Sequence, residues 1–154
     1  MTEDRRPADD NSIPAEEPLY LRIFPGDDSL VPVDDGHRPT TGGVKGRDMD
    51  EPLSVDLGSI CTPQQTRDRD TDGNFHVAAF TAAMVRGAGL RIRRDPLAAN
   101  AAHALIYGSR KDALGNLIGG LTGGEYGKIA RFARIVIYAA PPQQPQPAVV
   151  PAAE

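Results

Sequence analysis

A segment with the composition of a calcium-binding loop runs from Asp68 to Gly73. Carboxylates stand at alternate positions, in Asp68, Asp70 and Asp72, and the glycine follows. Oxygen ligands at positions one, three and five and a glycine at position six open an EF-hand loop. The twelfth position of such a loop is a bidentate glutamate, whereas this chain has Ala79 there. We therefore expect a polar acidic turn, whose three carboxylates bind calcium weakly, with a Kd of roughly a millimolar or above.

A second candidate site lies in residues 37–47, with the sequence His-Arg-Pro-Thr-Thr-Gly-Gly-Val-Lys-Gly-Arg. Cations, hydroxyl groups and glycine N–H groups in one loop suit an anion such as phosphate. The candidate anion-binding residues are Arg38, Thr40, Thr41 and Lys45. The glycine spacing and the Lys-Ser/Thr ending of a phosphate-binding P-loop are missing. The alternative interpretation is a solvated, flexible loop.

His103 and Cys61 are two further side chains that could do chemistry. A histidine at the start of an apolar strand, as His103 is, is more often a structural hydrogen-bonding group than a catalyst, and no HExxH, CxxC or GxSxG pattern accompanies it. Cys61 is the only cysteine, so it cannot form an internal disulfide. We expect it to be a small, partly buried side chain, because no histidine lies near it in the sequence. The sequence indicates no cofactor and favours no metal.

Charge is distributed unevenly along the chain, although the net charge at pH 7 is only −4. Residues 1–75 carry 17 acidic and 8 basic side chains, and residues 76–140 carry 3 acidic and 9 basic ones. In one interpretation, which we favour, the two halves attract each other within the fold. In the other, residues 76–140 present a basic face to a phosphate-bearing ligand or a nucleic acid.

Alternation of apolar and polar residues and short apolar runs predict the strands, and capping residues and apolar spacing predict the helices. The predicted strands are 19–24, 53–57, 76–80, 90–93, 104–107 and 134–138. The predicted helices are 63–68, 82–88 and 127–133. The first of these helices follows a capping box at Thr62. Short strands and helices without a regular βαβ repeat indicate an α+β fold with a small mixed sheet.

Residues 76–88 allow two interpretations. Their apolar residues have the spacing of one continuous helix. Alternatively, a strand ends at Phe80, Thr81 is the N-cap of a helix over 82–88, and Gly89 follows in the left-handed position that ends many helices. We favour the second interpretation, because a threonine hydroxyl can accept a hydrogen bond from a free N–H group in the first turn.

Apolar content divides the chain into three parts. Residues 1–18 form an acidic tail and residues 141–154 a Pro/Gln-rich tail, and we expect both to be disordered because they have too few apolar side chains to offset the entropy of ordering. Residues 19–140 are the predicted single α+β domain, with a long loop at 26–52 and a mobile glycine-rich connection at 109–127. No apolar run could span a bilayer, and no signal peptide is evident. We expect a soluble cytoplasmic protein.

Several segments resemble a family of small bacterial proteins. They are Arg-Pro-Thr-Thr-Gly-Gly-Val-Lys, Leu-Ser-Val-Asp-Leu, Thr-Pro-Gln-Gln and Asp-Pro-Leu-Ala-Ala-Asn-Ala-Ala-His-Ala-Leu-Ile-Tyr-Gly, within residues 19–108. This resemblance implies no activity. The layout of the chain is also similar to that of ADP-ribosyltransferases. The similarity implies that Arg22 on a first strand, Ser54 on a later one and His103, in place of the transferase glutamate, are candidate catalytic residues.

Three functions are consistent with these observations. The first is a small non-enzymatic binding or accessory protein that contacts an unknown protein partner through its charged faces. The alternative is a nucleotide-handling transferase, and the second alternative is a weak calcium-binding protein. The transferase requires its side chains to converge in one concave pocket, whereas in a binding protein they would be scattered. The side chains concerned are Arg22, Thr40, Thr41, Ser54 and His103.

Overall fold

The computed structural model describes residues 2–26, 28–45, 48–69 and 74–140 of the chain. The strands are β1 (Pro18–Ile23), β2 (Leu30–Val33), β3 (Gly36–Pro39), β4 (Leu53–Leu57), β5 (His76–Thr81), β6 (Arg91–Arg94), β7 (His103–Tyr107) and β8 (Arg134–Ile137). The helices are α1 (Thr41–Val44), α2 (Pro63–Asp68), α3 (Ala82–Gly87) and α4 (Gly123–Phe132).

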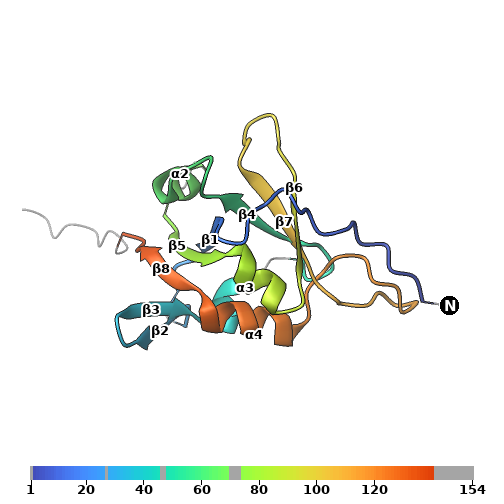
Figure 1. Ribbon diagram of the computed structural model, residues 1–154. Helices are drawn as coiled ribbons and strands as arrows, with labels where there is room; N and C mark the ends of the chain where they lie inside the picture. Colours follow the sequence, from blue (N-terminus) through green and yellow to red (C-terminus); the bar gives the residue numbers. More distant parts are fainter. Residues whose placement is uncertain (1, 27, 46–47, 70–73, 141–154) are drawn as a thin grey trace, which may run out of the picture.

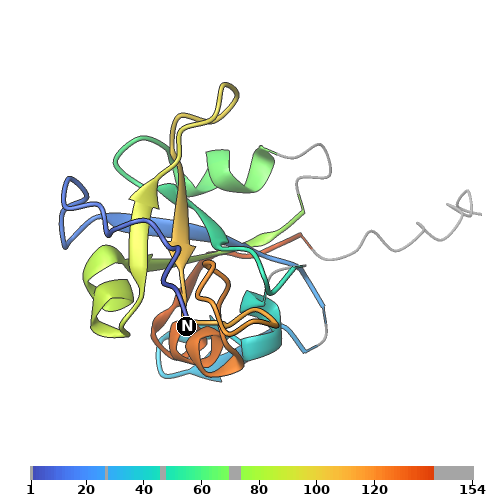
Figure 2. The ribbon, with the colours of Figure 1, turned by 90° about the vertical axis from the view of Figure 1, so that its right-hand side faces the viewer.

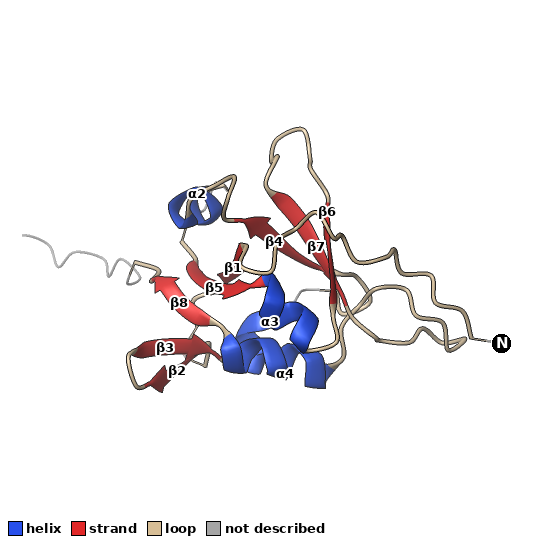
Figure 3. Cartoon of the chain, in the orientation of Figure 1, coloured by secondary structure: helices blue, strands red, loops and turns tan. Residues whose placement is uncertain are grey.

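Six of the strands form one antiparallel sheet in the order β6-β7-β4-β1-β5-β8 (Figure 1). The other two, β2 and β3, form a separate antiparallel pair (Figure 3). The prediction of a small fold that combines a sheet with a few short helices is therefore confirmed, and the fold is richer in strands than in helices. In Figure 1, α3 and α4 lie on one side of the sheet and α2 lies on the other.

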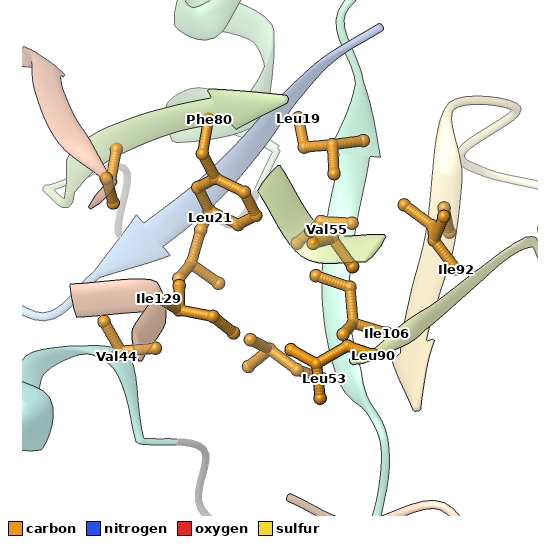
Figure 4. Packing of buried hydrophobic residues seen from close by; sticks show 14 of the residues in the cluster. Leu19, Leu21, Val44, Leu53, Val55, Phe80, Leu90, Ile92, Ile106 and Ile129 are labelled. Atoms are coloured by element: carbon orange, nitrogen blue, oxygen red, sulfur yellow. The ribbon is translucent and has the colours of Figure 1, made fainter. Parts of the chain in front are cut away.

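The hydrophobic core lies between the sheet and the helices α3 and α4 (Figure 4). In the central strand β1, Leu19, Leu21 and Ile23 are buried while the residues between them are more exposed. Side chains alternate across a strand, so one face of the sheet carries the apolar set and packs on the helices. Tyr126 and Ile129 of α4 join the same cluster. On the opposite face, the residues of β1 and β4 that lie between the core-facing ones are polar.

Helix α3 follows β5 directly, and the predicted break at Thr81 is confirmed. Thr81 is the extended N-cap of α3, and its hydroxyl accepts a hydrogen bond from the Met84 N–H at 3.3 Å. Gly89, just after the helix, has φ of +82°, a conformation that favours glycine. The predicted capping box before α2 is also present, since the Gln65 side chain accepts from the Thr62 N–H at 2.9 Å.

Helix α4 begins at Gly123, earlier than the predicted start at Gly127. Glycines in its first turn weigh against a helix by about 1 kcal/mol each. The Thr122 hydroxyl accepts from the Glu125 N–H at 3.2 Å, and the Glu125 carboxylate accepts from the Thr122 N–H at 2.9 Å. Glu125 also accepts hydrogen bonds from the backbone and hydroxyl of Ser109. These contacts favour the earlier start despite the glycines.

The long loop predicted over residues 26–52 contains three short elements. The strand β2 forms a hairpin with β3. Helix α1 follows its N-cap Thr40, whose hydroxyl accepts from the Gly43 N–H at 3.1 Å. Four-residue elements are too short to show a clear periodicity, which is why the sequence indicated only a loop.

The N-terminal segment, which we expected to be a disordered tail, lies along the edge strand β6 (Figure 2). Asp10 N–H donates to the Ile92 carbonyl at 2.9 Å, and the Asp9 carboxylate accepts from the Ile92 N–H at 2.9 Å. Ile13 is only 1% exposed and belongs to the core. The segment has few apolar side chains to offset the entropy lost when it becomes ordered. Its hydrogen bonds to the open edge of the sheet offset that loss instead.

The glycine-rich connection before α4 pairs with this N-terminal segment. Arg5 N–H donates to the Leu117 carbonyl at 2.8 Å, and Leu117 N–H donates to the Glu3 carbonyl at 2.9 Å. The predicted C-terminal tail, residues 141–154, lies outside the described residues. Within the described parts of the chain, no helix has the length and apolar character to cross a membrane.

Candidate functional site

The three candidate catalytic side chains converge on the polar face of the sheet. Arg22 comes from β1 and Ser54 from β4, each between core-facing residues of its strand, and His103 begins β7 directly before the core residue Ala104. All three line one cavity of about 330 Å³. The other residues lining this cavity are Tyr20, Val55, Asp56, Thr66, Arg69, Leu97, Ala99 and Asn100. The neighbouring strands β1, β4 and β7 thus bring together residues that are distant in the sequence.

Ser54, His103 and Asp95 form a hydrogen-bonded chain across this face. The β4–β7 register sets His103 opposite Asp56 and Ser54 opposite Leu105, so Ser54 and His103 are diagonal neighbours. Ser54 Oγ lies 3.1 Å from His103 Nε2. On the other side of the ring, Nδ1 lies 3.0 Å from the Asp95 carboxylate oxygen Oδ2 and 3.0 Å from the Asp95 carbonyl.

The hydrogen-bond partners assign the tautomer of His103. Both neighbours of Nδ1 are acceptor oxygens of Asp95, so Nδ1 carries the proton in the neutral ring. Nε2 is then an acceptor, and the Ser54 hydroxyl donates to it. The His103 side chain is 14% exposed and that of Asp95 is 44% exposed. A short connection between β6 and β7 holds this pair, since the Asp95 N–H donates to the His103 carbonyl at 2.9 Å.

Asp56 ties the wall of the cavity together. Its residue is 6% exposed, and one carboxylate oxygen accepts from the Asn100 amide at 2.8 Å. The other oxygen accepts from the Thr66 hydroxyl at 2.8 Å and from the Arg69 guanidinium at 3.3 Å. Through these bonds, one strand residue anchors both α2 and the loop before β7. A buried carboxylate that accepts from three donors holds those donors in place.

Two arginines give the cavity a cationic lining. Arg69 is the C-cap of α2, and its side chain is 28% exposed while it contacts Asp56. The Arg22 guanidinium lies over the Phe75 ring, 5.2 Å from the ring centroid. Burial raises the pKa of the Tyr20 hydroxyl, and nearby Cys61 and Glu17 add to the rise. The tyrosine therefore stays a neutral hydrogen-bonding group at neutral pH.

A second cavity, of about 420 Å³, adjoins the first. Arg69 and Asn100 line both cavities, so the two cavities are neighbours between the end of α2 and the loop before β7. Cys61 and Ile60 contribute apolar lining to the second cavity. Cys61, which we expected to be partly buried, is buried, and its thiol lies 3.5 Å from the Thr66 hydroxyl.

The predicted anion-binding residues are not part of either cavity. The Thr40 hydroxyl caps α1 and also donates to the Asp28 carbonyl at 2.6 Å. The Arg38 guanidinium donates to the Pro39 carbonyl at 3.0 Å. Thr41 and Lys45 are exposed in and just after α1. Of the five side chains named for a transferase, Arg22, Ser54 and His103 therefore meet, and the two threonines lie elsewhere.

The calcium hypothesis falls mainly on residues that the structure does not describe. Asp70 and Asp72 lie outside the described residues. Asp68, at the end of α2, is bound by the Arg67 guanidinium at 2.8 Å, which lowers the pKa of its carboxyl group. Position twelve of the loop, Ala79, lies in β5, so a strand follows where an EF-hand has a helix. Among the described residues, no cluster of three or more His, Cys, Asp or Glu side chains could hold a metal ion.

Contacts within the fold partly explain the uneven charge of the sequence. Arg86 donates to the Asp9 carboxylate at 3.0 Å, and Arg91 donates to the Asp4 carboxylate at 2.9 Å. Arg94 donates to the Ser12 hydroxyl at 3.0 Å in the same segment. The acidic N-terminal segment thus covers part of the basic surface, in agreement with the interpretation that the two halves attract each other.

Sequence reasoning did not single out Asp56, Arg69, Asp95 or Asn100, which line the cavity or contact His103. A signal for Asp56 was available, because alternation in Leu-Ser-Val-Asp-Leu puts Ser54 and Asp56 on one face of a strand. The others lie at element ends and in loops, where the sequence contains no periodicity that predicts their direction.

Comparison of the chain with protein-family models, with curated proteins and with solved structures finds no match. The resemblance noted for residues 19–108 therefore stays a prediction. The function has to be argued from the geometry of the cavity itself.

Proposed function

We propose that the chain binds a small phosphate-bearing ligand of the nucleotide class on the polar face of its sheet. The observation that carries the proposal is that Arg22 and Arg69 line the same cavity as Ser54 and His103. Guanidinium groups are suited to phosphate because their N–H donors match two phosphate oxygens at once. The Ser54 hydroxyl and the His103 imidazole add hydrogen-bonding groups beside the charge.

The dimensions of the cavity support a ligand larger than a free phosphate ion. Its volume of about 330 Å³ is within the usual range for small-molecule sites. The adjoining cavity of about 420 Å³ shares the Arg69 side chain with it. Leu97 and Ile60, each about half exposed, offer apolar surface at the rim. A nucleotide combines the two features required, an anionic phosphate and a flat apolar base.

This proposal follows the nucleotide-handling alternative in part. Arg22, Ser54 and His103 meet the condition of convergence in one pocket, and Thr40 and Thr41 do not belong to it. The proposal therefore concerns binding, and it uses Arg69 and Asn100 in place of the two threonines. Partial cover of the basic surface by the N-terminal segment weighs against a broad nucleic-acid face.

Isothermal titration calorimetry with ADP, adenosine and inorganic phosphate tests the proposal. We expect saturable binding of ADP, weakened by salt, and much weaker binding of uncharged adenosine. Arg69→Gln should lower the ADP affinity at least about tenfold, because a charge-assisted hydrogen bond contributes about 1.5–3 kcal/mol. The matched control is Arg67→Gln, which removes a charge from the same helix outside both cavities and should change the affinity less than about twofold.

Two outcomes would contradict the proposal. One is the absence of saturable binding for both ADP and phosphate at low salt. The other is an equal loss of affinity in the two arginine variants, which would mean that only the net charge matters. If inorganic phosphate bound as tightly as ADP, the nucleoside would contribute no affinity, and the ligand would be a small anion.

A further inference from the structure

We propose that Ser54 is an activated nucleophile that cleaves small carboxylic esters, with His103 as its general base and Asp95 as a positioning residue. The inference goes beyond ligand binding, and it stands whether or not the natural ligand carries a phosphate. It rests on the hydrogen-bonded chain from Ser54 through the imidazole to the Asp95 carboxylate.

The geometry fits the requirements of nucleophilic catalysis. A base must lie within hydrogen-bond reach of the nucleophile, and a third group must orient the base. Ser54 Oγ is 3.1 Å from Nε2, and Asp95 Oδ2 is 3.0 Å from Nδ1. The two contacts lie on opposite nitrogens of the ring, so the tautomer that accepts the serine proton is the one that the carboxylate stabilises.

The solvent exposure of Ser54 and His103 suits their proposed roles as nucleophile and base. Ser54 is exposed at the cavity, so a substrate can reach its hydroxyl. The His103 side chain is only 14% exposed, so most of its surface is shielded from water. Asp95 directly follows β6, while Ser54 in β4 and His103 in β7 stand on strands of the sheet. Such rigid supports limit the loss of alignment that loops would allow.

The charged lining supplies stabilisation for the negative charge that develops during attack. Arg22 and Arg69 line the cavity that Ser54 faces. Cationic donors in a partly enclosed site stabilise a developing oxyanion more strongly than water does. The same guanidinium groups can therefore bind an anionic ligand and assist the reaction of an ester carbonyl.

The reaction proceeds in two balanced steps. The Ser54 oxygen attacks the carbonyl carbon and its proton moves to Nε2 of His103. The C–O bond to the alcohol then breaks, and the leaving alcohol takes the proton from Nε2, which leaves an ester on Ser54. In the second step water attacks this ester, His103 takes the proton of the water, and the carboxylic acid departs as the serine regains its proton.

Covalent labelling with diisopropyl fluorophosphate tests the assignment independently of any natural substrate. The serine oxygen forms a bond to phosphorus, fluoride leaves and the proton passes to the base. We expect mass spectrometry of the labelled, digested protein to locate one diisopropylphosphoryl group on Ser54. Ser54→Ala should abolish this label, and His103→Gln should slow it by about 10² or more. Ser12→Ala and His37→Gln are matched controls outside the cavity and should label like the wild type.

Hydrolysis of p-nitrophenyl acetate separates the role of Asp95 from a merely structural one. Asp95→Asn should lower kcat at least about tenfold while KM changes less than about twofold, because the amide orients the imidazole without stabilising its charged form. Circular dichroism confirms that each variant is folded. The proposal would be overturned if the label were absent or on another residue. It would also be overturned if His103→Gln were labelled as fast as the wild type. If Ser54→Ala still binds ADP but is not labelled, the loss of labelling reflects the missing nucleophile and not a loss of ligand binding.

Discussion

At the residue scale, Asp56 is the side chain on which the shape of the candidate site depends. It lies in β4 beneath the cavity and accepts hydrogen bonds from Thr66, Arg69 and Asn100. These three donors belong to α2 and its cap and to the loop before β7. A single buried carboxylate therefore determines where both walls of the cavity sit relative to the sheet.

Replacing Asp56 with alanine should destabilise the protein and open the cavity. The Thr66 hydroxyl and the Asn100 amide would lose their acceptor in a buried position, which costs about 2–4 kcal/mol. Urea unfolding at constant slope measures this loss. Asp34→Ala, at an exposed turn, is the control and should change stability by less than about 0.5 kcal/mol. A similar small change for both variants would mean that the network does not hold the walls.

At the element scale, the cap of α3 separates a strand of the sheet from a helix over the core. Thr81 ends β5 and its hydroxyl accepts from Met84 N–H, so the chain changes from an extended to a helical path at this residue. β5 lies between β1 and β8, and α3 packs against β5 and β6. The cap thus decides where a central strand ends.

Thr81→Ala should cost about 1 kcal/mol, whereas Thr81→Ser should be nearly neutral, because serine keeps the hydroxyl that accepts from the helix. Urea unfolding of the three proteins compares them, provided that the slope is unchanged. At an interior helix position alanine would instead be neutral or stabilising. A stabilised alanine variant would therefore contradict the cap.

At the scale of the whole molecule, an acidic segment at the start of the chain covers the edge of the sheet. Its Asp9 carboxylate accepts both from the Ile92 N–H at 2.9 Å and from the Arg86 guanidinium at 3.0 Å. An uncovered edge strand is open to pairing with another chain, and charged cover of this kind limits such pairing. The segment therefore satisfies backbone groups of β6 and neutralises part of the basic surface.

Asp9→Ala should lower the free energy of unfolding by about 1–2 kcal/mol, because it removes two partly buried hydrogen bonds to a charged acceptor. Glu16→Ala removes the same charge from an exposed position of the same segment and should change stability by less than about 0.5 kcal/mol. Both variants change the net charge equally, so their difference isolates the contact. Equal thermal unfolding midpoints would mean that the segment contributes nothing at this position.

Much of the local structure followed from the sequence, and part of the site did as well. Alternation and short apolar runs located the six strands of the sheet to within a residue or two, and hydroxyl residues located the starts of α2 and α3. These features depend on residues a few positions apart, for which local hydrogen bonds and side-chain direction are sufficient causes. The similarity to a transferase layout brought Arg22, Ser54 and His103 together as candidates, and they do share a cavity.

The rest was decided by tertiary structure alone. Ser54 and His103 are 49 residues apart, and their hydrogen bond exists only because β4 pairs with β7 in one register. A shift of one residue would turn every side chain of a strand to the other face, and no local pattern states which strands are neighbours. Order in the acidic N-terminal segment has the same origin. Its apolar content is low, and the hydrogen bonds that hold it come from the edge of β6, which forms only when the sheet is assembled.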